Sequence, residues 1–211
     1  MINLVPQKSL DEAKVQISTI LTRIGALRFG TFTLSSGVLS PYYVDLRIIP
    51  SYPEAFQKIT DLYVELAKKK IGLNKFDRIA GIPTAGMPFS SVVALKLSKP
   101  FLYVRKEAKT HGRERRIEGI LMPGDRVLLV DDLVTSGGTL IDAADAVRAE
   151  GAVVNDALIL LDREEGAKNS MIKVGINLNC LMGMTEVAKI LYDRDTIDKE
   201  QFKSIMKTVK G

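Results

Sequence analysis

The chain has 211 residues, of which 46% are hydrophobic and 26% are charged, a balance typical of a globular protein rather than a disordered one. Its single cysteine excludes an intrachain disulfide, and with only one histidine a Cys/His zinc cluster is excluded as well. No apolar run approaches the roughly 20 residues of a membrane-spanning helix, and the first residues lack the pattern of a signal peptide. We therefore expect a cytoplasmic protein without a membrane partner.

The chain carries 30 Lys and Arg against 25 Asp and Glu, which gives a net charge of +5. Such an excess suits a nucleic acid or a smaller anionic ligand. Where the excess positive charge lies along the chain therefore helps to decide between a nucleic acid and a smaller anionic ligand.

The first third of the chain predicts two helices around a hairpin. Ser9 and Glu12 have the spacing of a capping box, and apolar residues then recur at helical intervals up to the next glycine. Residues 29–34 and 42–47 have the composition of two short strands joined by a turn rich in Ser, Gly and Pro. A second helix is expected over 53–70, where it ends in three lysines.

From there on, short apolar runs alternate with helical stretches. The expected strands are residues 78–82, 101–104, 126–130, 154–161 and 174–181, and the expected helices are 85–97, 139–150 and two more after 185 and 196. This alternation is typical of an α/β fold with a parallel sheet and crossover helices. Ligands of such folds bind at the carboxyl ends of the strands.

The strand expected over 126–130 is followed by two acidic residues, Asp131 and Asp132, where we expect the chain to leave the sheet for solvent. Adjacent carboxylates repel each other unless a cation or a polyhydroxyl ligand meets them. The next segment, Thr135-Ser-Gly-Gly-Thr139, opens a helix and offers backbone N–H groups and hydroxyls. Such a segment can hold a phosphate monoester.

Other interpretations of this segment are a helix cap with a turn, the phospho-acceptor of a receiver domain, and a Walker-B strand. The last requires a glycine loop that ends in Gly-Lys-Ser/Thr. The glycine loop of this chain, Gly81 to Gly86, continues with Met87 and Pro88 instead.

Residues 127–139 resemble the phosphoribosyl-pyrophosphate motif of the type I phosphoribosyltransferases. The resemblance implies an α/β fold with a central parallel sheet flanked by helices and a small N-terminal hood. It also implies that the carboxylates face the ribose hydroxyls, that the loop holds the 5′-phosphate, and that Mg²⁺ is a cofactor held through the substrate, with Asp131 and Asp132 as candidate ligands. The implied phosphoribosyl-pyrophosphate contacts in this motif are Asp131, Asp132, Leu133, Val134, Thr135, Ser136, Gly137, Gly138 and Thr139.

Much of the positive charge lies in one segment. Residues 105–118 contain six Lys or Arg and three Glu, which is +3 of the total +5. The polar composition and the glycines at 112 and 119 predict a mobile loop, whose cations could cover a polyanion and exclude water. A solvated loop or a nucleic-acid patch is the alternative, although no aromatic residue other than the histidine is interleaved.

The arrangement Arg-Lys-x-x-Lys-x-His-Gly in this segment closely resembles the catalytic loop of the orotate phosphoribosyltransferases. The residues implied to contact pyrophosphate are Arg105, Lys106, Lys109 and His111. Lys109 or His111 would protonate or neutralise the leaving group, and the implied catalytic set also includes Asp131 and Asp132. The resemblance further implies a homodimer in which the loop 105–119 is shared between subunits.

On spacing alone, residues 32–45 fit an ordinary hairpin with a Ser/Gly/Pro turn. They also resemble the hood segment of the same enzymes, in which the positions of Tyr43 and Val44 line the base pocket. Arg163 matches the family's orotate-binding arginine, and a guanidinium suits a carboxylate. Thr135 is implied to contact the orotate as well.

Two positions depart from the pattern of many bacterial members of the family. Ser35 stands where they carry a lysine, and Thr84-Ala85 stands where they carry Tyr-Lys. We expect backbone N–H groups of Thr84, Ala85 and Gly86 to meet a substrate phosphate instead.

The sequence thus predicts a single phosphoribosyltransferase domain over 1–211, with a hood from roughly 1–50 plus C-terminal elements and a core over roughly 51–180. The expected activity is transfer of a phosphoribosyl group to orotate in pyrimidine (UMP) biosynthesis, with small-molecule substrates and no nucleic acid. The alternatives are a phosphoribosyltransferase for another base and a non-catalytic regulator that senses phosphoribosyl pyrophosphate. Such a regulator should carry an additional nucleic-acid-binding element.

Overall fold

The computed structural model describes residues 7–33, 37–106 and 116–210. The chain divides into two compact units, one formed by Met1–Phe56 together with Met182–Gly211 and the other by Gln57–Leu181. The assignment of a hood and a core to one phosphoribosyltransferase domain stays a prediction. Within the described ranges, no helix combines the length and the apolar character needed to cross a membrane.

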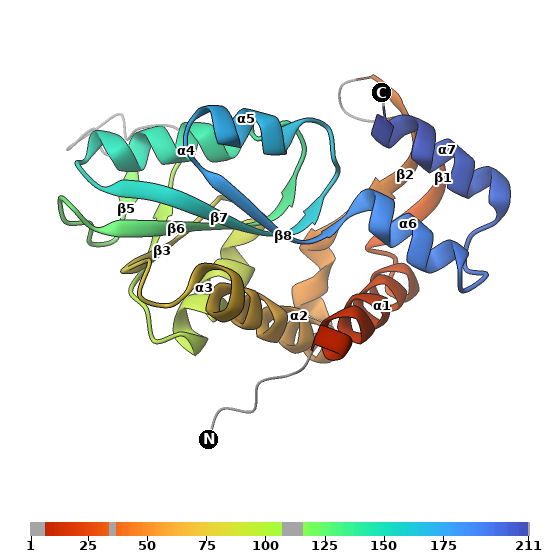
Figure 1. Ribbon diagram of the computed structural model, residues 1–211, viewed down its shortest axis with the longest axis horizontal. Helices are drawn as coiled ribbons and strands as arrows, with labels where there is room; N and C mark the ends of the chain where they lie inside the picture. The colour runs from red at the N-terminus through yellow and green to blue at the C-terminus, as the bar shows by residue number, and fades with distance from the viewer. Residues whose placement is uncertain (1–6, 34–36, 107–115, 211) are drawn as a thin grey trace. The chain divides into compact units, whose positions relative to one another are not determined.

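The first unit joins the two ends of the chain (Figure 1). It contains α1 (Gln7–Arg23), β1 (Leu27–Thr33), β2 (Leu39–Val44), a 3-10 helix (Leu46–Ser51), α6 (Met184–Tyr192) and α7 (Lys199–Lys210). β1 and β2 pair antiparallel with Phe29 opposite Tyr42, so the predicted hairpin is confirmed, although both strands begin earlier than expected. An ion pair of 2.7 Å between Lys14 and Glu186 joins α1 to α6.

The second unit is built on a six-stranded sheet in the order β5-β4-β3-β6-β7-β8. Its strands are β3 (Arg78–Gly81), β4 (Phe101–Val104), β5 (Ile117–Glu118), β6 (Arg126–Val134), β7 (Val153–Asp162) and β8 (Asn177–Gly183). β3 pairs in parallel with β4 and β6, and β6 with β7, whereas β5 is antiparallel to β4. The predicted α/β sheet, mostly parallel, is confirmed.

Helices cover both faces of this sheet. α4 (Gly138–Ala149) and α5 (Ala167–Lys173) lie on one face, and α3 (Gly86–Lys96) lies on the other (Figure 1). α2 (Pro53–Leu66) leads from the first unit into the second and continues as a π-helical turn, Ala67–Ile71. The Tyr63 ring on α2 lies 6.1 Å from the Phe89 ring on α3.

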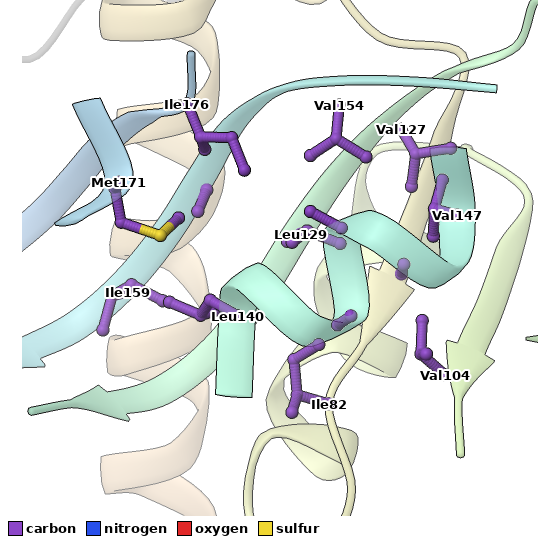
Figure 2. Close-up of a cluster of buried hydrophobic side chains, with 14 of the residues drawn as sticks. Ile82, Val104, Val127, Leu129, Leu140, Val147, Val154, Ile159, Met171 and Ile176 are labelled. Carbon is purple, nitrogen blue, oxygen red and sulfur yellow. The ribbon is translucent and has the colours of Figure 1, made fainter. Parts of the chain in front are cut away.

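The centre of the sheet explains why residues 127–130 of β6 form an uninterrupted apolar run. Val127 and Leu129 join the buried cluster beneath α4 and α5, together with Leu140, Met171 and other side chains (Figure 2). Successive side chains of a strand point to opposite faces, so Leu128 and Val130 are buried on the other face. A strand covered on both sides needs apolar residues at every position.

Two predicted segments need correction in this unit. β8 begins at Asn177 rather than at 174, because Val174 ends α5. α5 has only seven residues, too few for helical periodicity to show in the sequence. The segment expected as a loop over 105–119 contains β5, which is paired with the end of β4.

Leu129→Ala should lower the free energy of unfolding by about 2–5 kcal/mol, because it leaves a cavity at a fully buried position. The midpoint of urea unfolding measures this change. Leu95→Ala is the matched control, since the Leu95 side chain on α3 is 78% exposed. It should change the free energy of unfolding by less than about 0.5 kcal/mol, and equal losses for the two variants would contradict the packing described here.

Candidate active site

Asp131 and Asp132 lie inside β6 rather than at its exit to solvent. β6 pairs with β7 until Val134 lies opposite Asp162. Only 8% of Asp131 and 7% of Asp132 is exposed. The expectation that the chain leaves the sheet at these two carboxylates is therefore wrong, because β6 stays paired with β7 past both acids.

Three neighbours define the surroundings of Asp131. The Tyr63 hydroxyl donates a hydrogen bond of 2.7 Å to the Asp131 carbonyl oxygen, and the Asp132 backbone N–H donates one of 3.0 Å to Asp131 Oδ1. Gly86, the first residue of α3, packs so closely that a Cβ there would lie 2.3 Å from Asp131 Oδ1 and 3.0 Å from its Cα. Only glycine fits at this approach of α3 to β6.

The electrostatics of the pair follow from burial. Burial, and secondarily the Asp132 carboxylate, raises the pKa of Asp131 to about 9. Burial and the same two acids raise the pKa of the Tyr63 phenol well above its usual value, so this hydroxyl stays a hydrogen-bond donor. Two adjacent buried acids cannot easily both ionise. The pair therefore favours a ligand that brings positive charge or hydroxyl donors.

The segment after β6 has the geometry of an anion site. Gly137 has a φ of +89° and is the N-cap of α4, and Gly138 begins the helix. The first N–H groups of a helix have no partner within it and favour a negative charge. A Cβ on Gly137 would meet Met171 at 3.5 Å, so α5 supports the loop from behind. The predicted phosphate cradle is thus a turn leading into a helix N-terminus.

The turn that follows β7 brings Arg163 beside this loop. The Arg163 backbone N–H donates to the Val134 carbonyl oxygen at 3.0 Å, and the Ala167 N–H donates to the Thr135 carbonyl oxygen at 3.2 Å. The Val134 side chain belongs to the hydrophobic core, and Leu133 is partly buried. The predicted base-binding arginine and the phosphate loop are therefore joined through their backbones.

The basic segment is described only at its two ends. Arg105 and Lys106 follow β4, whereas Lys109 and His111 lie outside the described residues. The Arg105 N–H donates to the Arg116 carbonyl oxygen at 2.8 Å, and Arg116 Nε donates to the Arg105 carbonyl oxygen at 2.9 Å. The two ends of the segment are thus held together.

Two cations of this segment form ion pairs within the protein. The Arg116 guanidinium makes a bidentate contact with Asp142 on α4, with Nη1 to Oδ1 at 2.9 Å, and Arg105 lies 3.3 Å from Glu118. The Arg116 guanidinium holds the pKa of Asp142 below its usual value. Part of the positive charge predicted to meet a ligand is therefore used to attach the segment to β5 and α4.

Tyr43 and Val44 lie on β2, in the first unit. The Arg28 guanidinium lies 5.1 Å from the centre of the Tyr43 ring, and Arg47 Nη2 donates to the Tyr43 hydroxyl at 3.4 Å. The role of Tyr43 and Val44 at the base stays a prediction, and Ser35 lies outside the described residues.

Thr84 and Ala85 lie immediately before α3, where the Pro83–Thr84 peptide bond is cis. Because these two residues precede the first turn of α3, their N–H groups lie at a helix N-terminus, next to the close approach of Gly86 to Asp131. Their role toward a substrate phosphate stays a prediction.

The donors present fit a magnesium ion that arrives with a substrate. In the described parts of the chain, no three His, Cys, Asp or Glu side chains are grouped to hold a metal ion. Asp131 and Asp132 supply two carboxylates, and Mg²⁺ is commonly bound by one or two carboxylates together with waters and substrate phosphates. A resident ion held by protein ligands alone would need more donors.

Sequence reasoning missed Tyr63 and the close packing of Gly86 against Asp131. Tyr63 lies within the helix expected over 53–70, and no spacing reveals the acceptor of its hydroxyl. Gly86 carried a usable signal, because a glycine at a helix start after a strand often marks a close approach. The sequence alone could not identify Asp131 as the group approached.

Asp131→Asn should flatten the pH dependence of stability in the ligand-free protein. The pKa of Asp131 in the folded protein, about 9, exceeds the 3.8 that is usual for an aspartate. Its contribution to stability is therefore present below about pH 4 and is lost as the pH rises toward 9. Wild type should lose stability in urea between about pH 5 and pH 8, and the variant should lose less. Asp193→Asn, at an exposed position, should keep the wild-type slope; identical slopes for all three proteins would contradict the burial of Asp131.

Comparisons with known proteins agree with this geometry. Residues 50–189 match the phosphoribosyl transferase domain family. An orotate phosphoribosyltransferase of Cenarchaeum symbiosum is 41% identical over 194 residues, which cover 92% of this chain and 95% of that one. The crystal structure of orotate phosphoribosyltransferase from Aeropyrum pernix aligns with a TM-score of 0.75 at 32% identity, covering 86% of this chain and 99% of that one.

The structure of Leishmania donovani UMP synthase aligns with a TM-score of 0.83 at 32% identity, covering 95% of this chain and 43% of that longer one. The match to the family model and the identity over nearly the full length of a curated relative agree with the motifs on β6, on the turn after β7 and in the basic segment. The chain belongs to the orotate phosphoribosyltransferase family.

Proposed function

We propose that this chain transfers the phosphoribosyl group of 5-phospho-α-D-ribose 1-diphosphate to orotate, giving orotidine 5′-monophosphate and diphosphate in pyrimidine (UMP) biosynthesis. The observation that carries the proposal is the continuity of the buried Asp131–Asp132 pair with the Gly137 turn at the start of α4. The carboxylate pair suits a ligand with hydroxyl donors, and the start of α4 suits a phosphate monoester. Family membership selects orotate as the acceptor.

The ribose hydroxyls donate to the two carboxylates, and the 5′-phosphate accepts from N–H groups of the segment Thr135–Thr139. The Arg163 guanidinium binds the orotate carboxylate by charge-assisted hydrogen bonds. Because Arg163 and Thr135 belong to backbone segments that are hydrogen-bonded to each other, the acceptor and the donor are held in a fixed relation. Such positioning lowers the entropy cost of a two-substrate reaction.

In the reaction, a ring nitrogen of orotate attacks the anomeric carbon while diphosphate leaves, and the ribose passes through an oxocarbenium-like state. The carboxylates of β6 stabilise the positive charge that develops on the ribose. Mg²⁺, when bound with the substrate, neutralises the diphosphate and polarises it as a leaving group. Arg105 and Lys106 bind the diphosphate, and Lys109 or His111 protonates or neutralises it. No side-chain nucleophile is required.

We further propose a homodimer in which the loop 105–119 serves the neighbouring subunit. The support is the resemblance of this segment to the family's catalytic loop together with its net positive charge. The cytoplasmic location expected from the sequence stays a prediction.

Purified protein given Mg²⁺, orotate and phosphoribosyl pyrophosphate should consume orotate, measured as loss of its ultraviolet absorbance. Chelation of Mg²⁺ with EDTA should slow the reaction, because the leaving diphosphate is then not neutralised. Turnover of adenine but not of orotate would favour a phosphoribosyltransferase for another base. Binding of phosphoribosyl pyrophosphate without turnover of any base would favour a regulator.

Lys109→Ala should lower kcat by about 100-fold, the size typical of a lost proton donor or charge at a leaving group, with a much smaller effect on orotate KM. Steady-state kinetics on orotate measure both constants. Lys75→Ala, at an exposed position outside the basic segment, is the matched control and should keep the wild-type kcat. An unchanged kcat for Lys109→Ala would reject the catalytic role of the loop.

The same variant tests whether the loop is shared. Mixing Lys109→Ala with Asp131→Asn, each nearly inactive alone, should restore activity if the loop of one subunit serves the carboxylates of the other. Mixed dimers then contain one site with both wild-type residues. No recovery after confirmed subunit exchange would place the loop in its own subunit's site.

A further inference from the structure

The turn that carries Arg163 is held rigidly between β7 and α5. The two ends of the turn are fixed by the backbone hydrogen bonds from Arg163 to Val134 and from Ala167 to Thr135. Inside it, the Glu164 N–H donates to Asp162 Oδ1 at 2.7 Å, and Glu164 and Gly166 adopt φ values of +61° and +96°. The backbone that presents Arg163 is therefore fixed by contacts on both sides.

The Arg163 side chain is held by a residue of the same turn. Arg163 Nη2 lies 2.8 Å from Glu165 Oε1, a charge-assisted contact between residues two positions apart. The Arg163 side chain is 11% exposed, and that of Glu165 is 36% exposed. The Arg163 guanidinium is thus largely removed from solvent, and it is paired with Glu165, a carboxylate that is itself partly exposed.

This contact matters because arginine has a long, flexible side chain. Free rotation gives such a side chain considerable rotamer entropy, and part of it is lost whenever the guanidinium is fixed by a ligand. A partner that fixes the guanidinium beforehand removes that cost from ligand binding. A guanidinium has five N–H donors, so the contact of Nη2 with Glu165 is compatible with a second carboxylate.

We propose that Glu165 is a positioning residue for orotate: its carboxylate holds the Arg163 guanidinium in the orientation that receives the carboxylate of the base. The inference rests on the proposed role of Arg163 in the proposed function. Glu165 does not touch the reacting atoms, and its effect is confined to ligands that carry the base carboxylate. The alternative is competition, in which Glu165 occupies Arg163 and must be displaced by orotate.

The nucleotide products separate these possibilities without requiring turnover. Orotidine 5′-monophosphate and uridine 5′-monophosphate share the ribose phosphate and the pyrimidine ring, and only the first carries the carboxylate. Calorimetric titration of wild type, Glu165→Ala and Glu165→Gln with both nucleotides therefore isolates the carboxylate contact. Glu164→Gln is the matched control, because it removes the same charge one residue away and leaves the Arg163–Glu165 contact in place.

For Glu165→Ala, the Kd of orotidine 5′-monophosphate should rise about fivefold to tenfold, because part of the rotamer entropy of Arg163 is then lost on binding. The Kd of uridine 5′-monophosphate should stay within about twofold, since its binding does not use Arg163. Glu165→Gln keeps a neutral acceptor, so its Kd for orotidine 5′-monophosphate should lie between those of Glu165→Ala and wild type. The Kd of Glu164→Gln should equal that of wild type. In steady-state kinetics, orotate KM should rise with little change in kcat or in the KM of phosphoribosyl pyrophosphate.

Arg163→Ala tests whether Glu165 acts through Arg163. It should weaken orotidine 5′-monophosphate binding more than Glu165→Ala does, and adding Glu165→Ala to it should cause no further loss. Tighter binding in Glu165→Ala would overturn the proposal in favour of competition, and equal weakening of both nucleotides would overturn it in favour of a structural role. No effect of Arg163→Ala would overturn it together with the proposed role of Arg163. If the wild-type protein binds orotidine 5′-monophosphate but does not turn over orotate, the proposed activity is rejected. The Kd changes of the Glu165 variants would still decide the role of Glu165.

Discussion

The burial of two neighbouring carboxylates in one β-strand is the constraint on which the rest of the site depends. Asp131 and Asp132 are less than one tenth exposed, and like charges at such positions are costly in a low-dielectric interior. Tyr63 donates its hydroxyl to the Asp131 carbonyl rather than to a carboxylate, so it fixes the strand without using the carboxylates. In the free protein the raised pKa of Asp131 keeps this acid protonated at neutral pH, and a ligand that brings a cation favours its ionised form.

The packing around the pair follows from the same constraint. Gly86 allows α3 to lie directly against Asp131, which excludes water from one side of the carboxylate. Further along the chain, Gly137 turns the backbone into α4, and a Cβ at this position would lie 3.5 Å from Met171 of α5. The two glycines thus serve opposite purposes, since one brings protein close to an acid and the other exposes N–H groups to an anion. Together they place a negative and a positive subsite only a few residues apart.

The sequence predicted the parts of this molecule that depend on local composition. Apolar runs identified β4 to the residue and the positions of β3, β6 and β7, and the family resemblance identified the chemistry of the loop after β6. It could not predict that β6 continues through its acids, because that extension depends on the register of β6 against β7. It also could not find α5, which is too short to show periodicity, or the Arg116–Asp142 contact, which joins residues 26 positions apart.

The distribution of charge argues for a small polyanion rather than a nucleic acid. A nucleic-acid surface places cations over a face, where each neutralises a separate phosphate. Here +3 of the net +5 lies in residues 105–118, and Arg105 and Arg116 at the two ends of that segment pair with Glu118 and Asp142. These ion pairs attach the two ends of the segment to β5 and to α4, whose N-terminus is the proposed phosphate site. A short basic segment attached beside one anion site suits a diphosphate, which Arg105 and Lys106 are proposed to bind.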